Sequence, residues 1–377
     1  MPTKNKVVVA MSGGVDSSVA AALLVNQGYD VIGVMLRLWS EPGRENFNRC
    51  CAPDALTQAQ CVASILKIPF YAVAAQQIFY EKVVKYFLES YAQCLTPNPC
   101  LYCNRHIRWQ FLLDHALSIG ADFLATGHYA RIQETENGQV QLLRSIDEVK
   151  DQSYVLHVLN QDQLIHTLLP LGILAKKQVR QLAEDFELPV ANRPDSQDLC
   201  FLDNEDYRDF LLRHLPEVQK PGIIVDRYGK VLGQHQGLAF YTIGQRKGLG
   251  VSSPYPLYVL EKDTRNNTLI VGSVDELGKS ELTVGAVNWI AGKPPPKPFT
   301  SRVKIRYKAP LVQAIVSPIG DQAAHVSFKE PMRDITPGQA AVFYSGEVCL
   351  GGGIIQPVDT SLNQITHDSY EKTESSF

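Results

Sequence analysis

The sequence has no run of about 20 apolar residues, the length that a membrane-spanning helix requires. Its first residues, MPTKNKVVVAMSGG, turn glycine-rich after a short apolar stretch, so they lack the hydrophobic core of a signal peptide. It also has no internal repeat, and 45% of its 377 residues are hydrophobic. We therefore expect a globular cytoplasmic protein without a membrane partner, long enough for roughly two or three domains.

Two signatures of common nucleotide and nucleic-acid proteins are also missing. The GxxxxGK[ST] phosphate loop is absent, which disfavours kinase-type chemistry at a γ-phosphate. The formal net charge is −3, so no strongly basic character marks a nucleic-acid partner. A mildly basic segment after Pro221 is only a weak indication of such a partner.

Cysteine, by contrast, is well represented, with eight residues. Because the cytoplasm keeps thiols reduced, metal binding or thiol chemistry explains them better than structural disulfides. Cys100 and Cys103 form a Cys-x-x-Cys pair in TPNPCLYCNR, residues 96–105. Such a pair can hold a metal, perform disulfide chemistry or be structural. Cys50 and Cys51 are too closely spaced for an ordinary zinc pair and are interpreted as structural.

Up to about residue 130, short apolar runs alternate with amphipathic stretches. The expected strands are residues 6–12, 30–39, 68–75 and 121–130, and the expected helices are residues 17–28, 53–67, 79–93 and 108–120. This alternation predicts an α/β domain with a doubly wound parallel sheet. Asn137-Gly138 predicts a hairpin that interrupts the alternation.

The residue patterns after about residue 150 predict further domains. Residues 151–221 are expected to be mostly helical, and the glycine-rich, β-rich remainder is typical of a barrel or sandwich. We expect a catalytic domain at residues 1–150, followed by a helical tRNA-contacting region at 151–221. A small β domain at 222–292, a C-terminal β-barrel at 293–360 and a polar disordered tail at 361–377 are expected to follow.

The stretch AMSGGVDSS, residues 10–18, lies between the first expected strand and helix. There, backbone N–H groups and the helix dipole favour an anion, and Gly13 and Gly14 allow a phosphate to approach the backbone. Ser12, Ser17 and Ser18 add hydroxyl donors. Asp16 would repel phosphates unless a cation such as Mg²⁺ lies there.

This loop resembles the pyrophosphate loop of the ATP pyrophosphatase superfamily, whose members cleave ATP to AMP and pyrophosphate by adenylating a substrate oxygen. The resemblance implies that ATP and Mg²⁺ bind here, with Asp16 as the metal residue. The implied nucleotide-binding residues are Ala10, Met11, Ser12, Gly13, Gly14, Val15, Asp16, Ser17, Met35 and Gly127.

An adenylated oxygen is a good leaving group, and an amine or a thiol could displace AMP from it. A second stretch, RPDSQDLCFL, brings Cys200 as a further thiol. Thiolate is the reactive form, and Arg105, His106 and Arg193 are candidates for lowering a thiol pKa.

The chain resembles the bacterial tRNA 2-thiouridylase family, which thiolates the wobble uridine of tRNA. The stretches that carry this resemblance, in the family's order, are SGGVDSSV, TPNPCLYCNRHIRW, ATGHYAR, KDQSYVL, RPDSQDLCF, YTIGQRKGLG, KIRY and PGQAAVFY. The resemblance implies that Cys103 is the nucleophile and that Cys200 carries a persulfide. The implied tRNA-binding residues are Asn98, Pro99, Cys100, His128, Lys150, Asp151, Gln152, Arg306, Tyr307 and Gln339.

Alternating basic residues support the RNA interpretation. Arg302, Lys304 and Arg306 would lie on one face of a strand and could follow phosphates. The resemblance also implies the lysine, glutamate and glutamine tRNAs as substrates. It implies a cysteine desulfurase or a sulfur-relay protein as the sulfur donor.

Cys100 departs from the family, many of whose members have aspartate at this position. The change leaves a second mechanism open, in which Cys100, Cys103 and Cys200 hold an iron–sulfur cluster that delivers sulfide. We favour the persulfide mechanism. Two other functions are weighed against thiolation: a related synthetase that uses an amine, and a non-catalytic, metal-containing RNA-binding protein.

Overall fold

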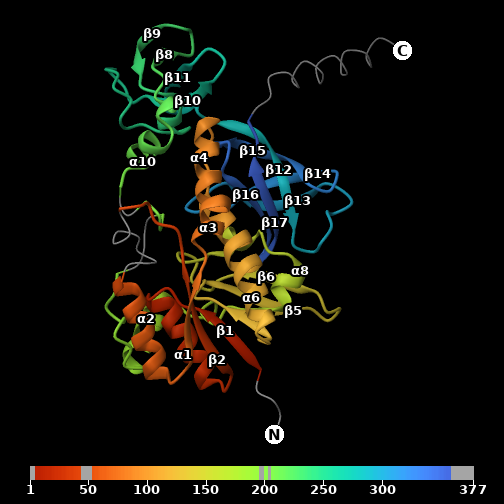
Figure 1. Ribbon diagram of the computed structural model, residues 1–377. Coiled ribbons are helices and arrows are strands. Elements are labelled where there is room, and N and C mark those ends of the chain that lie inside the picture. Colours follow the sequence, from red (N-terminus) through yellow and green to blue (C-terminus); the bar gives the residue numbers. More distant parts are fainter. Residues whose placement is uncertain (1–4, 44–52, 195–198, 203–204, 358–377) are drawn as a thin grey trace, which may run out of the picture.

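The computed structural model describes residues 5–43, 53–194, 199–202 and 205–357. Figure 1 shows an α/β part at one end, a small β-sheet at the other and a barrel beside the long helix between them. Cys50, Cys51 and the expected tail at 361–377 lie outside the described residues. No helix within the described ranges is long and apolar enough to cross a membrane.

A parallel sheet forms the core of the α/β part. Its strands are β1 (Lys6–Ala10), β2 (Asp30–Arg37), β3 (Phe70–Ala74), β4 (Phe123–Ala125) and β7 (Thr167–Leu168), in the order β3-β2-β1-β4-β7. Every neighbouring pair is parallel. The apolar runs become central strands because a parallel sheet is covered on both faces.

Helices cover both faces of this sheet. Val7 and Val9 of β1 pack in a cluster with α1 (Val15–Asn26) and α2 (Pro53–Leu66). Val8 points to the opposite side, into a cluster with the helix that ends in α6 (Leu113–Ser118). The alternation along one strand thus produces the two layers, and the prediction of a doubly wound sheet is confirmed.

Two long helical segments lead to and from the cysteine loop. The first comprises α3 (Gln76–Phe79), η2 (Tyr80–Val84) and α4 (Lys85–Ala92). The second comprises α5 (Pro99–Tyr102), η3 (Cys103–Leu112) and α6. Both include π-helical turns, which are frequent at functional sites.

The hairpin predicted at Asn137-Gly138 is present. It joins β5 (Ala130–Glu134) to antiparallel β6 (Val140–Arg144), and Gly138 has a φ of +76°. β6 also pairs with β17 (Val348–Ile355). Strand pairing therefore ties the α/β part to the barrel.

Residues 151–221 were expected to be mostly helical, but their described residues form short helices that cover less than half of the segment, together with strand β7 of the parallel sheet. Their helices are α7 (Ser153–Leu156), α8 (Gln161–Ile165), α9 (Lys176–Asp185), α10 (Tyr207–His214) and η4 (Pro216–Val218). The small sheet that follows has the order β10-β11-β8-β9. Its elements are β8 (Gly222–Asp226), β9 (Val231–His235), η5 (Leu238–Phe240), β10 (Tyr258–Asp263), β11 (Thr268–Gly272) and, after the sheet, η6 (Val274–Glu276).

The C-terminal strands form a closed antiparallel barrel, in agreement with the expected fold class. They are β12 (Lys279–Trp289), β13 (Phe299–Lys304), β14 (Val312–Ile319), β15 (Ala323–Met332), β16 (Ala340–Ser345) and β17. Pairing of β12 with β17 closes the ring. The boundary placed near residue 292 falls inside the barrel, in the proline-rich loop between β12 and β13.

Candidate active site

The predicted nucleotide loop lies at the carboxyl end of β1 and leads into α1. Gly13 has a φ of +71°, and a Cβ atom there would lie 2.3 Å from the carbonyl oxygen of Ala55. Only glycine fits both the conformation and the space. The hydroxyls of Ser17 and Ser18 donate to the carbonyl oxygen of Gly14, at 3.2 and 2.9 Å. These two hydroxyls hold the loop in shape, a role that the sequence did not suggest.

Met35 lies in β2 and Gly127 follows β4, the two strands that pair with β1. A Cβ atom at Gly127 would lie 2.7 Å from the backbone nitrogen of Ser17, so the segment after β4 presses against the loop. Met35 is buried in β2, in the same cluster as Met11. Their role in nucleotide binding remains a prediction.

Asp16 has partners that the sequence did not reveal. Lys176 Nζ lies 2.7 Å from its Oδ1 and 2.9 Å from its Oδ2, and the Tyr129 hydroxyl donates to Oδ1 at 2.7 Å. A carboxylate can serve Mg²⁺, but both oxygens here already contact the ammonium group. Metal binding by Asp16 therefore requires it to share or exchange Lys176, and the Mg²⁺ assignment stays a prediction.

The cysteine loop begins a helix. Asn98 caps α5, since its Oδ1 accepts from the backbone N–H of Cys100 at 3.2 Å, and Pro99 occupies the first turn. One helical turn then separates exposed Cys100 from buried Cys103. The two thiols of this pair therefore have different environments.

Cys200 comes to the same region from far along the chain. It packs against the hydrophobic cluster that includes Cys103, as do Leu199 and the flanking Phe201. Both predicted catalytic thiols thus contact the same apolar cluster. That environment limits water around a thiolate and its persulfide.

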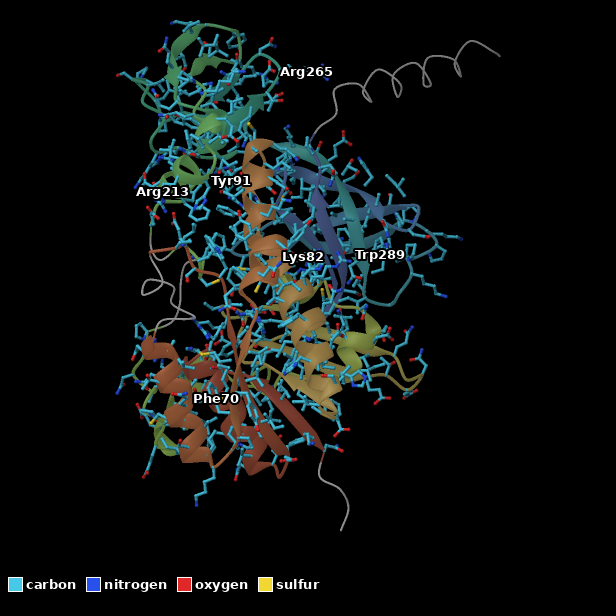
Figure 2. The ribbon with its side chains drawn as sticks, viewed as in Figure 1. Phe70, Lys82, Tyr91, Arg213, Arg265 and Trp289 are labelled. Atoms are coloured by element: carbon cyan, nitrogen blue, oxygen red, sulfur yellow. The ribbon has the colours of Figure 1, made fainter. Side chains whose placement is uncertain are left out.

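A pocket of about 490 Å³ adjoins this cluster. Its lining includes Asn98 and Pro99, which are predicted to bind tRNA, and Leu199, the residue before Cys200. Tyr91, labelled on α4 in Figure 2, stacks on Tyr207 of α10 at a ring-centroid distance of 5.0 Å. Both tyrosines line the pocket, so the pocket combines aromatic surface with a side-chain amide.

A three-cysteine metal site does not emerge from this geometry. Among the described residues, no three His, Cys, Asp or Glu side chains are grouped so that they could hold a metal ion. Cys100, Cys103 and Cys200 thus do not fit an iron–sulfur cluster in this arrangement, and no step below uses one.

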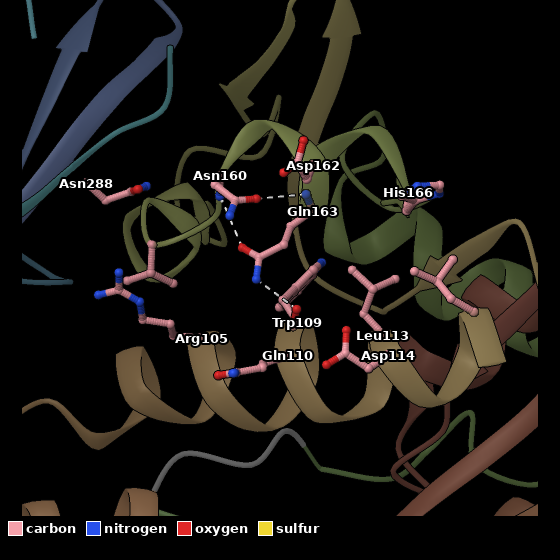
Figure 3. Close-up of a pocket in the computed structure, with 12 residues that line it drawn as sticks. Arg105, Trp109, Gln110, Leu113, Asp114, Asn160, Asp162, Gln163, His166 and Asn288 are labelled. Atoms are coloured by element: carbon pink, nitrogen blue, oxygen red, sulfur yellow. Dashed lines mark hydrogen bonds between the residues drawn. The ribbon is translucent and has the colours of Figure 1, made fainter. Parts of the chain in front are cut away.

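Of the three basic residues considered as thiol activators, Arg193 and Arg105 face other parts of the molecule. Arg193 contacts the nucleotide loop, where it donates to the carbonyl oxygen of Gly13 at 2.9 Å. Arg105 is exposed and lines a second pocket, of about 520 Å³, between η3 and α8 (Figure 3). His106 shares a hydrogen bond with Gln110.

Gln339 connects the barrel to the cysteine loop. Its Nε2 donates to the carbonyl oxygens of Thr96 and Pro97, at 2.9 and 3.2 Å. The backbone N–H of Thr96 donates to the carbonyl oxygen of Pro337 at 3.0 Å. The predicted tRNA residue Gln339 therefore also positions the loop that carries Cys103.

Several other predicted tRNA residues make internal hydrogen bonds. Buried Asp151 accepts from Ser145 and Ser153, and Gln152 Oε1 accepts from the backbone N–H of Tyr129. His128 is buried beside Thr126, and burial lowers its pKa well below the usual value. These bonds shape the surface near Lys150, and contact of all four residues with tRNA remains a prediction.

Arg306 and Tyr307 lie beyond the end of β13, which stops at Lys304. The expected basic strand face is therefore shorter than predicted. Arg306 pairs with Asp334, and Lys304 Nζ lies 5.6 Å from the centre of the Tyr307 ring. The turn after the strand gathers these groups on one side of the barrel.

Three family models match successive parts of the chain. The tRNA methyl transferase HUP domain matches residues 5–204, the tRNA methyl transferase PRC-barrel domain residues 208–273, and the aminomethyltransferase beta-barrel domain residues 279–355. The first of these models covers more than half of the chain. The three matched segments correspond to the α/β part with its adjoining helices, the small sheet and the barrel.

Curated relatives match over nearly the full length. The tRNA-specific 2-thiouridylase MnmA of Magnetococcus marinus is 49% identical over 357 residues, which cover 94% of this chain and 100% of that protein. The tRNA-specific 2-thiouridylase MnmA of Carboxydothermus hydrogenoformans is 46% identical, with 94% and 98% covered. The similarity thus extends across all three parts.

Proposed function

This chain belongs to the tRNA-specific 2-thiouridylase family, and from that premise we propose that it is an ATP-dependent tRNA sulfurtransferase acting on the wobble uridine. It replaces the C2 oxygen of that base with sulfur and releases AMP and pyrophosphate. The observation that carries this proposal is the packing of Cys103 and Cys200 against one apolar cluster, beside a pocket lined by Asn98 and Pro99.

The first step activates the uridine. Its C2 oxygen attacks the α-phosphorus of ATP, the bond to the β-phosphate oxygen breaks, and pyrophosphate leaves. The loop at Gly13 and Gly14 supports this step, because a helix N-terminus favours the phosphates. Mg²⁺, when bound with ATP, would offset phosphate charge, and Asp16 is the loop carboxylate suited to hold it.

The second step transfers sulfur from a persulfide on Cys200. The terminal sulfur attacks C2 and AMP leaves, so that the base is joined to Cys200 through two sulfur atoms. The Cys103 thiolate then attacks the Cys200 sulfur, forms a disulfide and expels the base as 2-thiouridine. In the alternative order, Cys103 first releases hydrosulfide, which attacks C2. An external thiol reductant and a persulfide donor restore the starting state in both.

The pocket beside Cys200 is the site we assign to the everted uridine. A base removed from the anticodon stack gains stacking on an aromatic side chain, and Tyr207 provides one. Arg208 also lines the pocket, and its Nε is buried without a hydrogen-bond partner among the described residues. That group can donate to an oxygen of the bound nucleotide.

The tRNAs for lysine, glutamate and glutamine are the proposed substrates, and a cysteine desulfurase or sulfur-relay protein is the proposed donor. Both follow from family membership. Thiolation assays with purified tRNAs and with candidate persulfide donors test them separately. No iron–sulfur cluster takes part in this proposal.

The test of the proposal is the Asp16→Asn variant, in which we expect AMP formation to fall about tenfold or more. A loss of roughly 1.4 kcal/mol is enough for that factor. The affinity for tRNA should stay nearly unchanged, because Asp16 lies at the nucleotide loop. The measurement is AMP and pyrophosphate release with tRNA present, next to a tRNA-binding titration.

Asp30→Asn, at the opposite end of the sheet, is the matched control. Equal loss of AMP formation and tRNA affinity in Asp16→Asn would contradict the assignment. Release of AMP that needs no tRNA would point to the amine-using synthetase. Binding of tRNA without any consumption of ATP would point to the RNA-binding protein.

Arg306→Ala is expected to weaken tRNA binding and to reduce its salt dependence by about one phosphate contact. The guanidinium lies at the end of β13, partly exposed and beside Asp334. Binding is measured as a function of salt concentration. Lys329→Ala, which removes an exposed basic residue of β15, is the control. An unchanged salt slope in Arg306→Ala would make Arg306 an ordinary surface residue.

A further inference from the structure

Two basic residues from the region after β7 reach the nucleotide loop. Lys176 contacts both carboxylate oxygens of Asp16, in the first turn of α1. On the other side, Arg193 donates from Nη1 to the carbonyl oxygen of Gly13, and its Nη2 lies 3.0 Å from Asp54 Oδ2. The loop thus contacts two cations that lie outside its own sequence motif.

These two cations offset negative charge at the nucleotide loop. Asp16 carries a negative charge next to the backbone N–H groups that would receive phosphates, and alone it would repel them. Lys176 cancels that charge within a contact whose lysine side chain is only 13% exposed. Low exposure strengthens the interaction relative to a surface ion pair. Arg193 is paired in the same way with Asp54, so the four side chains have no net formal charge and the loop does not repel an incoming phosphate.

The scaffold holds Lys176 in place before any ligand arrives. It is the first residue of α9, and its backbone N–H donates to Asp147 Oδ2 at 2.9 Å. Buried Val179 and Ala183 fix the same helix against the cluster that contains α1. The Lys176 ammonium group also lies 5.9 Å from the centre of the Tyr129 ring. A side chain ordered in this way loses little entropy on binding an anion.

We infer that Lys176 and Arg193 bind the β- and γ-phosphates of ATP and hold the pyrophosphate as it leaves. This inference rests on the proposed use of ATP. It assigns the phosphate charge to two residues outside the SGGVDSS loop. It also gives Asp16 a second role, since its carboxylate positions the Lys176 ammonium group at the loop.

Lys176→Met tests the inference through binding alone. We expect the affinity for an ATP analogue with a non-hydrolysable β–γ bridge to fall about 10- to 100-fold, the effect of losing one or two charge-assisted contacts. The affinity for AMP should change less than about threefold, because AMP lacks the two outer phosphates. Isothermal titration calorimetry of both ligands gives the ratio of the two affinities.

Three further variants extend this test. Lys177→Met removes the neighbouring, exposed lysine of α9 and should leave both affinities unchanged. Lys176→Arg keeps the charge and should retain most of the ATP affinity. Arg193→Met should show the same selective loss for the ATP analogue as Lys176→Met.

Equal losses for the ATP analogue and AMP in Lys176→Met, or no loss for either, would overturn the inference. Failure of the unsubstituted protein to bind ATP would instead remove the proposed function, and the inference with it. The two failures are distinguished because the first is seen only in the Lys176→Met variant, whereas the second is seen in the unsubstituted protein.

Discussion

Serine in place of Cys103 or Cys200 is expected to abolish formation of 2-thiouridine. Each thiol has a covalent role in the proposed reaction: Cys200 carries the transferred sulfur, and Cys103 breaks the resulting bond. A hydroxyl is a poor nucleophile toward sulfur and cannot carry a persulfide. Digestion of the tRNA and quantification of 2-thiouridine by mass spectrometry measure the loss. AMP release in the same reactions shows whether adenylation persists.

Cys100→Ser distinguishes the persulfide mechanism from the cluster mechanism. Cys100 is exposed and outside the apolar cluster of Cys103, so its loss should leave appreciable thiolation. Cys61→Ser, an exposed thiol on α2, is the control and should behave as the unsubstituted protein. Anaerobically purified protein whose iron content follows activity, with all three serine variants inactive, would replace the persulfide mechanism by the cluster mechanism.

Local sequence patterns were sufficient for much of the fold. The strand around Val8 is apolar on both faces, and that pattern alone indicated a sheet covered by two helical layers. Asn137-Gly138 predicted its hairpin because the turn needs positive φ, which Gly138 adopts. Both features depend on neighbours in the sequence.

The pairing between strands that are distant in the sequence could not be predicted from those patterns. Nothing within Val140–Arg144 shows that it will join β17, because the alternation of β6 fits any sheet edge. For the same reason the proline-rich loop at 293–297 looked like a domain boundary, although it connects two barrel strands. The basic alternation at 302–306 ended early because the chain turns after Lys304.

The residues of the candidate site likewise differ in whether the sequence could predict their roles. The need for glycine at position 13 could be interpreted from the sequence, since its positive φ concerns only the loop around it. Lys176, Arg193 and the loop contacts of Gln339 could not, because each depends on a tertiary contact. A lysine that begins a helix is common, and only its distance to Asp16 distinguishes this one.

Gly13→Ala is expected to reduce AMP formation by about 100-fold, a loss that a misplacement of 1 Å near the reacting groups can cause. The added Cβ would lie 2.3 Å from the carbonyl oxygen of Ala55, and that atom is backbone and cannot rotate away. The φ of +71° is also unfavourable for alanine. The loop must therefore shift away from α2, which moves the phosphate-binding N–H groups.

Gly28→Ala separates displacement from backbone strain. Gly28 has a φ of +88° but nothing within 4 Å of an added Cβ, and it lies beyond the far end of α1. Its replacement should cost about 1 kcal/mol of stability, measured by urea denaturation, with AMP formation unchanged. If Gly13→Ala lost no more activity than Gly28→Ala, the position of this loop could not be what activates the uridine. The adenylation step would then have to be assigned to another part of the α/β domain.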